Sequence, residues 1–223
     1  MRVATFNVHH CEGRDGICDV RRVAEVVRST GADVVALQEL DMGMERTGFT
    51  NQPGEIAAAT GLTVEFHPVL QRDDGRYGNA LAARQRLDSA KMPLPSVARE
   101  EPRAAVVGRY GGITFVGAHL SRSRRARAEQ IRALAALAER LEPPVVLMGD
   151  LNEVAAGLQP LLDAGFTPVR YPWWKRAWLR LRPSRAIDHI LAGPGLRIEL
   201  QQAIKTVASD HPVLVAEVVP AAR

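Results

Sequence analysis

The chain has 223 residues, 46% of them apolar, and a formal net charge of +4. This length suits one large α/β domain with a sizeable core, and no run approaches the ~20 apolar residues that would span a bilayer. The N-terminus enters a strand-like run at once, without the apolar region of a signal peptide. We therefore expect a single monomeric domain over residues 1–223 in the cytoplasm; an exported form whose signal was removed stays open.

Arginine greatly outnumbers lysine, and the positive balance favours a polyanionic partner such as nucleic acid or an anionic membrane surface. An arginine-rich composition without functional meaning explains the charge about equally well. The only cysteines are Cys11 and Cys18. With His9 and His10 they match no usual zinc spacing, so we predict two reduced thiols.

The N-terminal part of the chain predicts a β-α-β unit. Residues 1–8 form a strand-like run, and Asp19 is placed to cap a helix with apolar residues at helical spacing that Gly31 ends. A second buried strand follows at residues 34–37. Because such units join neighbouring strands, we expect these two strands to lie side by side.

The rest of the chain alternates strand-like runs with two further helices. A short helix is predicted after Gly54, ending at Gly61, and a long amphipathic helix over residues 124–141 is stopped by Pro143-Pro144. Strands outnumber helices and occur with and without helical crossovers, so mixed pairing in an α/β domain is expected. The remaining strand-like runs are 63–66, 80–83, 104–107, 113–118, 145–148, 187–191 and 213–218.

Short polar motifs sit where these apolar runs end. Strand ends are where α/β proteins collect functional side chains, and carboxylates with carboxamides suit Mg²⁺ or Mn²⁺. Imidazoles beside them suit acid and base work on a phosphate ester. The motifs are Thr5-Phe6-Asn7, Gln38-Glu39, Gly78-Asn79, His119-Leu120, Gly149-Asp150-Leu151-Asn152 and Ser209-Asp210-His211.

In this order the motifs resemble the endonuclease/exonuclease/phosphatase superfamily, which includes pancreatic deoxyribonuclease, abasic-site endonucleases, inositol polyphosphate phosphatases and neutral sphingomyelinases. The resemblance extends from Asn7 to His211. It implies two mixed β-sheets packed face to face with helices outside, a four-layer sandwich. Each motif alone is weak, whereas six in register are specific.

For the metal, the resemblance assigns Glu39 a direct contact and Asp210 the metal or its water shell. Asn7 is expected to serve the metal in the same way. Asparagine disfavours strands, which indicates that Asn7 stands in the first run for its side chain. The implied cofactor is Mg²⁺ or Mn²⁺.

For catalysis, the resemblance implies that Asp150 orients or deprotonates the attacking water and that Asn152 donates its amide to the phosphate. If the segment is extended, their spacing puts both side chains on one side. His211 is implied to contact the scissile phosphate or to act as an acid or base. His119 matches the second imidazole of the nuclease and sphingomyelinase branches, and Asp188 matches the acid that orients the catalytic imidazole.

Asn79 and Arg103 are candidate substrate contacts, the latter weighed equally against a solvated arginine. All three tryptophans fall in residues 171–183, a segment with several arginines and no acidic residue. This segment suits stacking on bases, a membrane interface, or packing as a lid against the fold. Trp173, Trp174 and Arg176 are its candidate contacts.

The chain departs from the family pattern in three places. Residues Ala82-Ala83-Arg84 stand where many relatives have Ser-Arg, and Ala186 replaces a frequent Arg. His9-His10 follows the first strand without an assigned role. These departures affect substrate contacts rather than the chemistry.

We therefore predict a Mg²⁺-dependent phosphodiesterase that uses in-line attack by an activated water, with DNA as the favoured substrate. The alternatives are a phospholipid or a small or inositol phosphate ester. A catalytically silent binding module is disfavoured because the whole polar set is intact.

Overall fold

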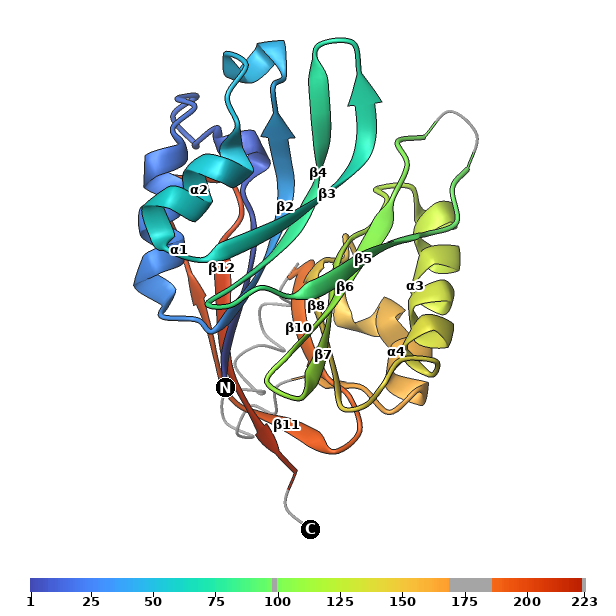
Figure 1. The fold of residues 1–223 in the computed structure, drawn as a ribbon. Coiled ribbons are helices and arrows are strands. Elements are labelled where there is room, and N and C mark those ends of the chain that lie inside the picture. Colours follow the sequence, from blue (N-terminus) through green and yellow to red (C-terminus); the bar gives the residue numbers. More distant parts are fainter. Residues whose placement is uncertain (98–99, 169–185, 222–223) are drawn as a thin grey trace.

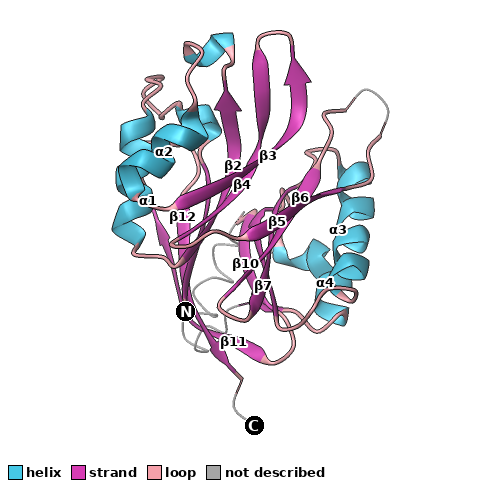
Figure 2. Cartoon of the chain, viewed as in Figure 1, coloured by secondary structure: helices cyan, strands magenta, loops and turns pink. Residues whose placement is uncertain are grey.

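The computed structural model describes residues 1–97, 100–168 and 186–221. Two six-stranded mixed sheets lie face to face, with helices on the outer face of each (Figures 1 and 2). This arrangement confirms the predicted sandwich of two sheets and outer helices. No helix in the described ranges is both long and apolar enough to cross a membrane.

The first sheet has the strand order β11-β12-β1-β2-β4-β3. Its centre is the predicted β-α-β unit, in which β1 and β2 pair in parallel. Asp19 caps α1 by accepting hydrogen bonds from the amides of Arg21 and Arg22 at 2.9 and 3.3 Å, and Gly31 ends it in the left-handed conformation. The elements are β1 (Arg2–Asn7), α1 (Val20–Thr30), β2 (Val34–Met42), α2 (Gln52–Thr60), β3 (Thr63–Arg72), β4 (Gly75–Ala83), β11 (Leu196–Ile204) and β12 (Val213–Pro220).

The second sheet has the order β5-β6-β7-β8-β10-β9 and repeats the same plan. Here β7 and β8 pair in parallel, and α3 connects them on the outer face. The elements are β5 (Asp88–Pro93), β6 (Ala104–Tyr110), β7 (Ile113–His119), α3 (Arg124–Ala138), β8 (Val145–Asp150), α4 (Gln159–Asp163), β9 (Thr167–Pro168) and β10 (Asp188–Ala192). Short 3-10 turns are η1 (His9–Cys11), η2 (Glu45–Thr47) and η3 (Ala155–Leu158).

Three apolar layers hold these elements together. The layer between the sheets includes Leu81, Phe115 and Met148, and the other two lie under α1–α2 and under α3–α4. The sheets approach closely at Gly117, where a Cβ atom would lie 3.2 Å from Leu81 Cδ2 and 3.3 Å from Ala36 Cβ. Each fully buried Leu or Phe contributes roughly 1.5–3 kcal/mol. Both sheets are thereby fixed as one frame for the loops at their ends.

Several element bounds differ from the expectations. The short helix begins at Gln52, ahead of Gly54, because Asn51 caps it by accepting a hydrogen bond from the Gly54 amide. The long helix ends at Ala138 rather than at residue 141. The sequence did not indicate β5 and β11, since both are edge strands with several polar or exposed residues and therefore lack an apolar run.

The two parallel pairs bring their carboxyl ends to one place between the sheets. In register, Asn7 pairs with Gln38 across β1 and β2, and His119 pairs with Asp150 across β7 and β8. The side chains of Asn7 and Asp150 are hydrogen-bonded to each other, so the two ends meet. The polar motifs of the sequence therefore converge, as strand ends do in α/β folds.

Candidate active site

Glu39 enters the site from a bulge in the middle of β2. The pairing of β2 with β4 shifts register between Leu37 and Leu40, and Glu39 has φ +63°, a conformation that non-glycine residues rarely adopt. Its amide donates to Asn79 Oδ1 at 3.4 Å. The sequence suggested a carboxylate just past the end of a strand. Instead, the strand continues to Met42, and the bulge turns the Glu39 side chain towards the second sheet.

Asn7, the last residue of β1, is fully buried and links the two carboxylates. Its Nδ2 donates to Glu39 Oε1 at 2.8 Å and to Asp150 Oδ2 at 3.0 Å. Its Oδ1 accepts a hydrogen bond from the His9 amide at 3.0 Å. The amide nitrogen, rather than the oxygen, therefore faces the carboxylates and sets the distance between them.

Asp150 ends β8 and is almost completely buried. The preceding Gly149 has φ +149°, and a Cβ atom there would collide with the Ala118 carbonyl oxygen, so only glycine fits where β7 and β8 lie closest. Burial and the nearby Asp188 raise the pKa of Asp150 to about 6, although His211 and hydrogen bonds from Asn152 and Asn7 oppose this shift. The carboxyl group consequently titrates near neutral pH.

Asn152 does not lie in an extended segment, so the condition for the predicted alignment with Asp150 is not met, although both residues line the same cavity. Its φ of +50° turns the chain, and its amide nitrogen atom instead donates to Asp150 Oδ1 at 2.9 Å. Its side-chain Nδ2 donates to the Leu120 carbonyl at 2.9 Å. The second hydrogen of Nδ2 is available to another acceptor at the site.

His211 is held by a carboxylate. Its Nδ1 lies 3.1 and 3.0 Å from the two oxygens of Asp188, and its Nε2 lies 3.7 Å from Asp150 Oδ2. Burial lowers the pKa of His211, but the hydrogen bond and charge of Asp188, together with Asp150 and Asp210, raise it more, to about 9. His211 is therefore protonated at neutral pH, with Nε2–H directed at Asp150.

His119, the last residue of β7, is held by a cation instead. Arg103 Nη1 lies 3.0 Å from His119 Nδ1. A guanidinium only donates, so Nδ1 is the acceptor and the imidazole proton is on Nε2. Burial, followed by the charges of Arg103, His211 and Arg122, keeps the pKa of His119 well below its ordinary value. His119 is consequently a neutral imidazole.

Both imidazoles face the same oxygen atom. His119 Nε2 lies 3.6 Å and His211 Nε2 3.7 Å from Asp150 Oδ2, and His119 Nε2 is 3.8 Å from Glu39 Oε1. The potential ligand atoms of Glu39, His119 and Asp150 lie within 4.8 Å of one another, and those of Asp150, Asp188 and His211 form a second such group. The carboxylates of these clusters are able to hold a divalent metal, whereas the two imidazoles carry protons on the Nε2 atoms that face them.

The other predicted residues occupy different positions. Asp210 is largely exposed at the rim, with its Oδ1 4.0 Å from His9 Nδ1. Asn79 is buried under Glu39, so within the described chain it contacts the Glu39 backbone. Three predicted contacts lie outside the described residues, namely Trp173, Trp174 and Arg176.

The site opens into a cavity of about 570 Å³ between the sheets. Three consecutive left-handed residues, His9 to Cys11, turn the chain so that His9 and His10 line this cavity. Sequence reasoning missed the cavity residues Arg46, Tyr77 and Arg122. Arg46 pairs with the buried Asp41 through two 2.7 Å hydrogen bonds, and its guanidinium lies over the Tyr77 ring. Of these, only Tyr77 had a sequence signal, since it directly precedes the Gly78-Asn79 motif.

Comparisons with known proteins agree with this fold. The model of the Endonuclease/Exonuclease/phosphatase family matches residues 4–211, and no curated protein matches the sequence. An endonuclease/exonuclease/phosphatase family protein from Bacteroides thetaiotaomicron is 18% identical, with a TM-score of 0.77 over 100% of this chain and 98% of that one.

Two further solved structures share the fold. An endonuclease/exonuclease/phosphatase from Beutenbergia cavernae is 21% identical, with a TM-score of 0.76 over 98% of this chain and 71% of that one. An AP endonuclease from Archaeoglobus fulgidus is 19% identical, with a TM-score of 0.68 over 97% and 98% of the two chains.

The fold and the site together define a two-sheet α/β protein with carboxylates and imidazoles at the meeting point of its parallel strands. The chain belongs to the endonuclease/exonuclease/phosphatase family. Members of this family are mostly hydrolases and typically depend on a metal.

Proposed function

We propose that the chain is a divalent-metal-dependent phosphodiesterase that hydrolyses nucleic acid, with DNA as its substrate. One observation carries the proposal: the buried carboxylate of Asp150 lies between two imidazoles, the neutral His119 at 3.6 Å and the charged His211 at 3.7 Å. Phosphodiester hydrolysis needs an oriented attacking water, neutralisation of charge on the phosphate and protonation of the leaving oxygen. The site offers a separate group for each task.

Glu39 and Asp150 supply hard carboxylate oxygens, which fit Mg²⁺ or Mn²⁺. When bound, the ion would neutralise charge on the phosphate. Glu39 would hold the ion, and the exposed Asp210 carboxylate at the rim would add negative charge near it. Asn7 keeps the two carboxylates in place. The predicted contact of Asn7 with the metal or its water shell would require the side-chain amide to turn, because its oxygen accepts a hydrogen bond from the His9 amide.

The side chains divide the proton transfers between them. Asp150, ionised above a pKa of about 6, orients and deprotonates the attacking water. His211 donates the proton on Nε2 to the leaving oxygen, while Asp188 holds Nδ1–H and thereby fixes the tautomer. Neutral His119 and the second hydrogen of Asn152 Nδ2 donate hydrogen bonds to the other phosphate oxygens.

Nucleic acid is favoured as the substrate by Arg72 and Arg122, which line the cavity beside its acidic residues and form no ion pair in the described ranges. Similarity to the AP endonuclease supports the same class. We further propose one monomeric domain in the cytoplasm. Contacts of Trp173, Trp174 and Arg176 with substrate or with a membrane stay predictions.

A substrate panel with Mg²⁺ or Mn²⁺ tests this function. The panel contains plasmid DNA, abasic duplex, RNA, sphingomyelin, phosphoinositides and a bis-aryl phosphodiester. We expect DNA hydrolysis that EDTA abolishes. Preference for sphingomyelin or a phosphoinositide would contradict the nucleic-acid assignment, and no turnover of any substrate would indicate a binding module.

Glu39→Gln tests the metal ligand itself. Losing this carboxylate should lower kcat by at least ~10²-fold, in the range for losing a main charge stabiliser. Glu25→Gln, at an exposed position of α1, is the matched control and should keep wild-type rates. Full turnover in EDTA, or unchanged rates in Glu39→Gln, would refute the proposed function.

A further inference from the structure

The first turn of α3 carries basic residues where helices usually have acidic ones. Arg124 and Arg125 follow the N-cap residue Ser123, and the turn contains no acidic residue. The N-terminus of a helix is the positive end of its dipole, so cations there are unfavourable. The Ser123 side chain makes no capping hydrogen bond. Local stability therefore does not explain the presence of these arginines.

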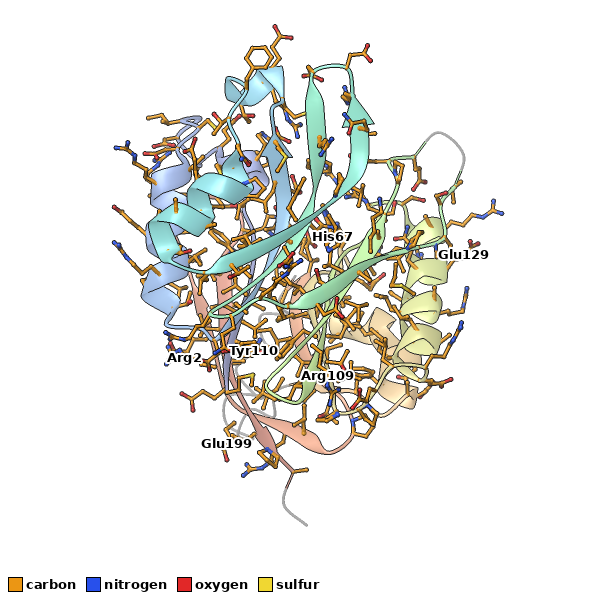
Figure 3. All side chains as sticks on the ribbon, in the orientation of Figure 1. Arg2, His67, Arg109, Tyr110, Glu129 and Glu199 are labelled. Carbon is orange, nitrogen blue, oxygen red and sulfur yellow. The ribbon has the colours of Figure 1, made fainter. Side chains whose placement is uncertain are left out.

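Their guanidinium groups are also unpaired. Arg122, Arg124 and Arg125 are exposed, and none forms an ion pair or hydrogen bond through its side chain within the described chain. Glu129, one turn further along, projects outward from α3 (Figure 3) and makes no ion pair with Arg125 among the described residues. We call Arg122, Arg124 and Arg125 the basic surface.

Arg127 on the same helix, by contrast, is bound within the protein. Its Nε lies 3.0 Å from Glu153 Oε2, and its Nη1 donates to the carbonyls of Ser121 and Arg122 at 3.1 and 2.9 Å. It thereby ties α3 to the loops at both sides. The basic surface makes no such contacts, although it belongs to the same helix start.

The basic surface begins at the catalytic cavity, and Arg124 and Arg125 follow Arg122 at the start of α3. Arg122 lines the cavity, together with Arg103. The Arg103 side chain is only 9% exposed, and its Nη1 lies 3.0 Å from Glu101 Oε1 and 3.0 Å from His119 Nδ1. Its Nε, by contrast, has no hydrogen-bond partner in the described part of the chain. A buried, unpartnered donor is costly and indicates that a ligand acceptor completes the site. Anion-binding groups therefore extend from the cavity to the surface of α3.

From these observations we propose that the basic surface, with the unbonded amides of residues 124–126, binds backbone phosphates of a polynucleotide strand leaving the cavity. The inference rests on the proposed function and adds the path of the substrate outside the site. A strand with regularly spaced phosphates matches a row of cations that begins inside the cavity. An anionic membrane matches less well, because the first turn of α3 has no exposed apolar side chain to insert.

Oligonucleotide binding in EDTA tests the inference, because it measures binding without turnover. A triple variant removes the charges of the basic surface: Arg122→Gln, Arg124→Gln and Arg125→Gln. A matched control removes the same charge from exposed arginines that have no side-chain partner in the described ranges: Arg28→Gln, Arg132→Gln and Arg140→Gln. Affinity for a labelled 20-nucleotide single strand is measured at several salt concentrations.

We expect the surface variant to bind at least ~10-fold more weakly, and the slope of log affinity against log salt to fall by about 2, since each lost contact with a single strand removes roughly 0.7. The control should change affinity less than ~2-fold. Equal losses in both variants would show that only net charge matters. An unchanged slope, or a loss confined to phosphatidylserine vesicles, would overturn the inference.

Arg125→Glu separates binding from folding. An acidic residue at this end of the helix should raise the melting temperature by about 1–4 °C while it weakens oligonucleotide binding. A lower melting temperature with unchanged binding would mean that Arg125 is structural. An inactive protein that still binds through the basic surface would refute the proposed function alone, and an active enzyme whose surface variants bind normally would refute this inference alone.

Discussion

The two sides of the catalytic cavity present the same chemical group in opposite states. On the β7 side, His119 is held through Nδ1 by the guanidinium of Arg103, and on the β12 side, His211 is held through Nδ1 by the carboxylate of Asp188. Both Nε2 atoms lie at nearly equal distances from Asp150 Oδ2. Because the distances match, the difference between the two imidazoles comes from their burial and from the partner at Nδ1.

The protonation state of neither histidine could therefore have been assigned from its position in the sequence alone. Burial and then the cation beside His119 lower its pKa and leave a neutral ring that donates a hydrogen bond. The anion beside His211 outweighs burial, raises its pKa and leaves a charged ring with a proton to donate. Pairs of titratable groups whose environments separate their pKa values indicate acid and base roles. The predictions below test this contrast.

The largest effect is expected from removing either imidazole. His211→Ala should lower kcat by at least ~10²-fold, because it removes the proposed proton donor. This loss should shrink on a bis-aryl phosphodiester, whose leaving oxygen needs no proton, while the loss in His119→Ala should be similar on both substrates. The rates on DNA and on the aryl ester measure the contrast. If both variants lost the same amount of activity on each substrate relative to wild type, His211 would not be the specific proton donor, and the proposed roles of the two histidines would be wrong.

Asp188→Asn should lower the pKa of His211 towards its ordinary value, because it removes the carboxylate that raises it. We expect kcat at neutral pH to fall by about 10- to 100-fold, since His211 loses the partner that orients and charges it. The pKa of His211 is raised from 6.5 to about 9, so wild-type activity should decline as pH rises through 9, and in Asp188→Asn this decline should move towards 6.5. Steady-state rates from pH 5 to 10 check this shift. A decline near pH 9 in both proteins would contradict it.

The same shift predicts a pH dependence of stability. A raised pKa in the folded state means that the stabilisation by charged His211 is complete below pH 6.5 and is lost as pH rises through about 9. Thermal unfolding in EDTA should therefore show a lower melting temperature at pH 10 than at pH 6. Asp188→Asn should lack this part of the pH dependence; an unchanged profile would mean that other groups produce it.

Arg103→Met changes the opposite side. Burial is the main cause of the low pKa of His119, so removing the guanidinium should raise this pKa only partly. We expect kcat to fall by roughly 10-fold, within the range for losing a positioned hydrogen bond. Arg109→Met, which breaks a surface ion pair with Glu142 (Arg109 is labelled in Figure 3), is the control and should keep wild-type rates. An equal loss of kcat in Arg103→Met and Arg109→Met would show that Arg103 acts only through its charge and not through its contact with His119.

The smallest effect is expected at Ser209, which supports only the His211 side. Its Oγ donates to the Asn7 carbonyl at 2.7 Å and accepts the His211 amide at 3.1 Å. Ser209→Ala should cost about 1–3 kcal/mol of unfolding free energy, because buried partners lose their hydrogen bonds. kcat should fall only a few-fold. A loss as large as in His211→Ala would mean that Ser209 takes part in the chemistry.

The apolar runs predicted a strand-rich α/β domain and the β-α-β unit, and the polar motifs at their ends predicted that Asn7, Glu39, Asp150 and His211 would meet. These signals are local. The prediction of two sheets packed face to face came from the family resemblance. The pairing of Asp188 with His211 was also predicted, but from the family pattern rather than from these local signals.

The contrast between the two histidines was not predictable, because it depends on contacts between distant strands. Nothing near Arg103 in the sequence marks it as the partner of His119. The left-handed conformations of Glu39 and Asn152 were missed for a related reason: residues other than glycine rarely adopt them, and only the surrounding structure enforces them.

The proposed contrast between a neutral His119 and a charged His211 is tested most directly by measuring their protonation states. Nitrogen NMR of the imidazole rings in EDTA at pH 7, assigned with His119→Gln and His211→Gln, reports which ring nitrogens carry protons. We predict a neutral His119 with its proton on Nε2 and a His211 protonated on both nitrogens. Two neutral rings that titrate together near pH 6.5, the ordinary value, would contradict the account.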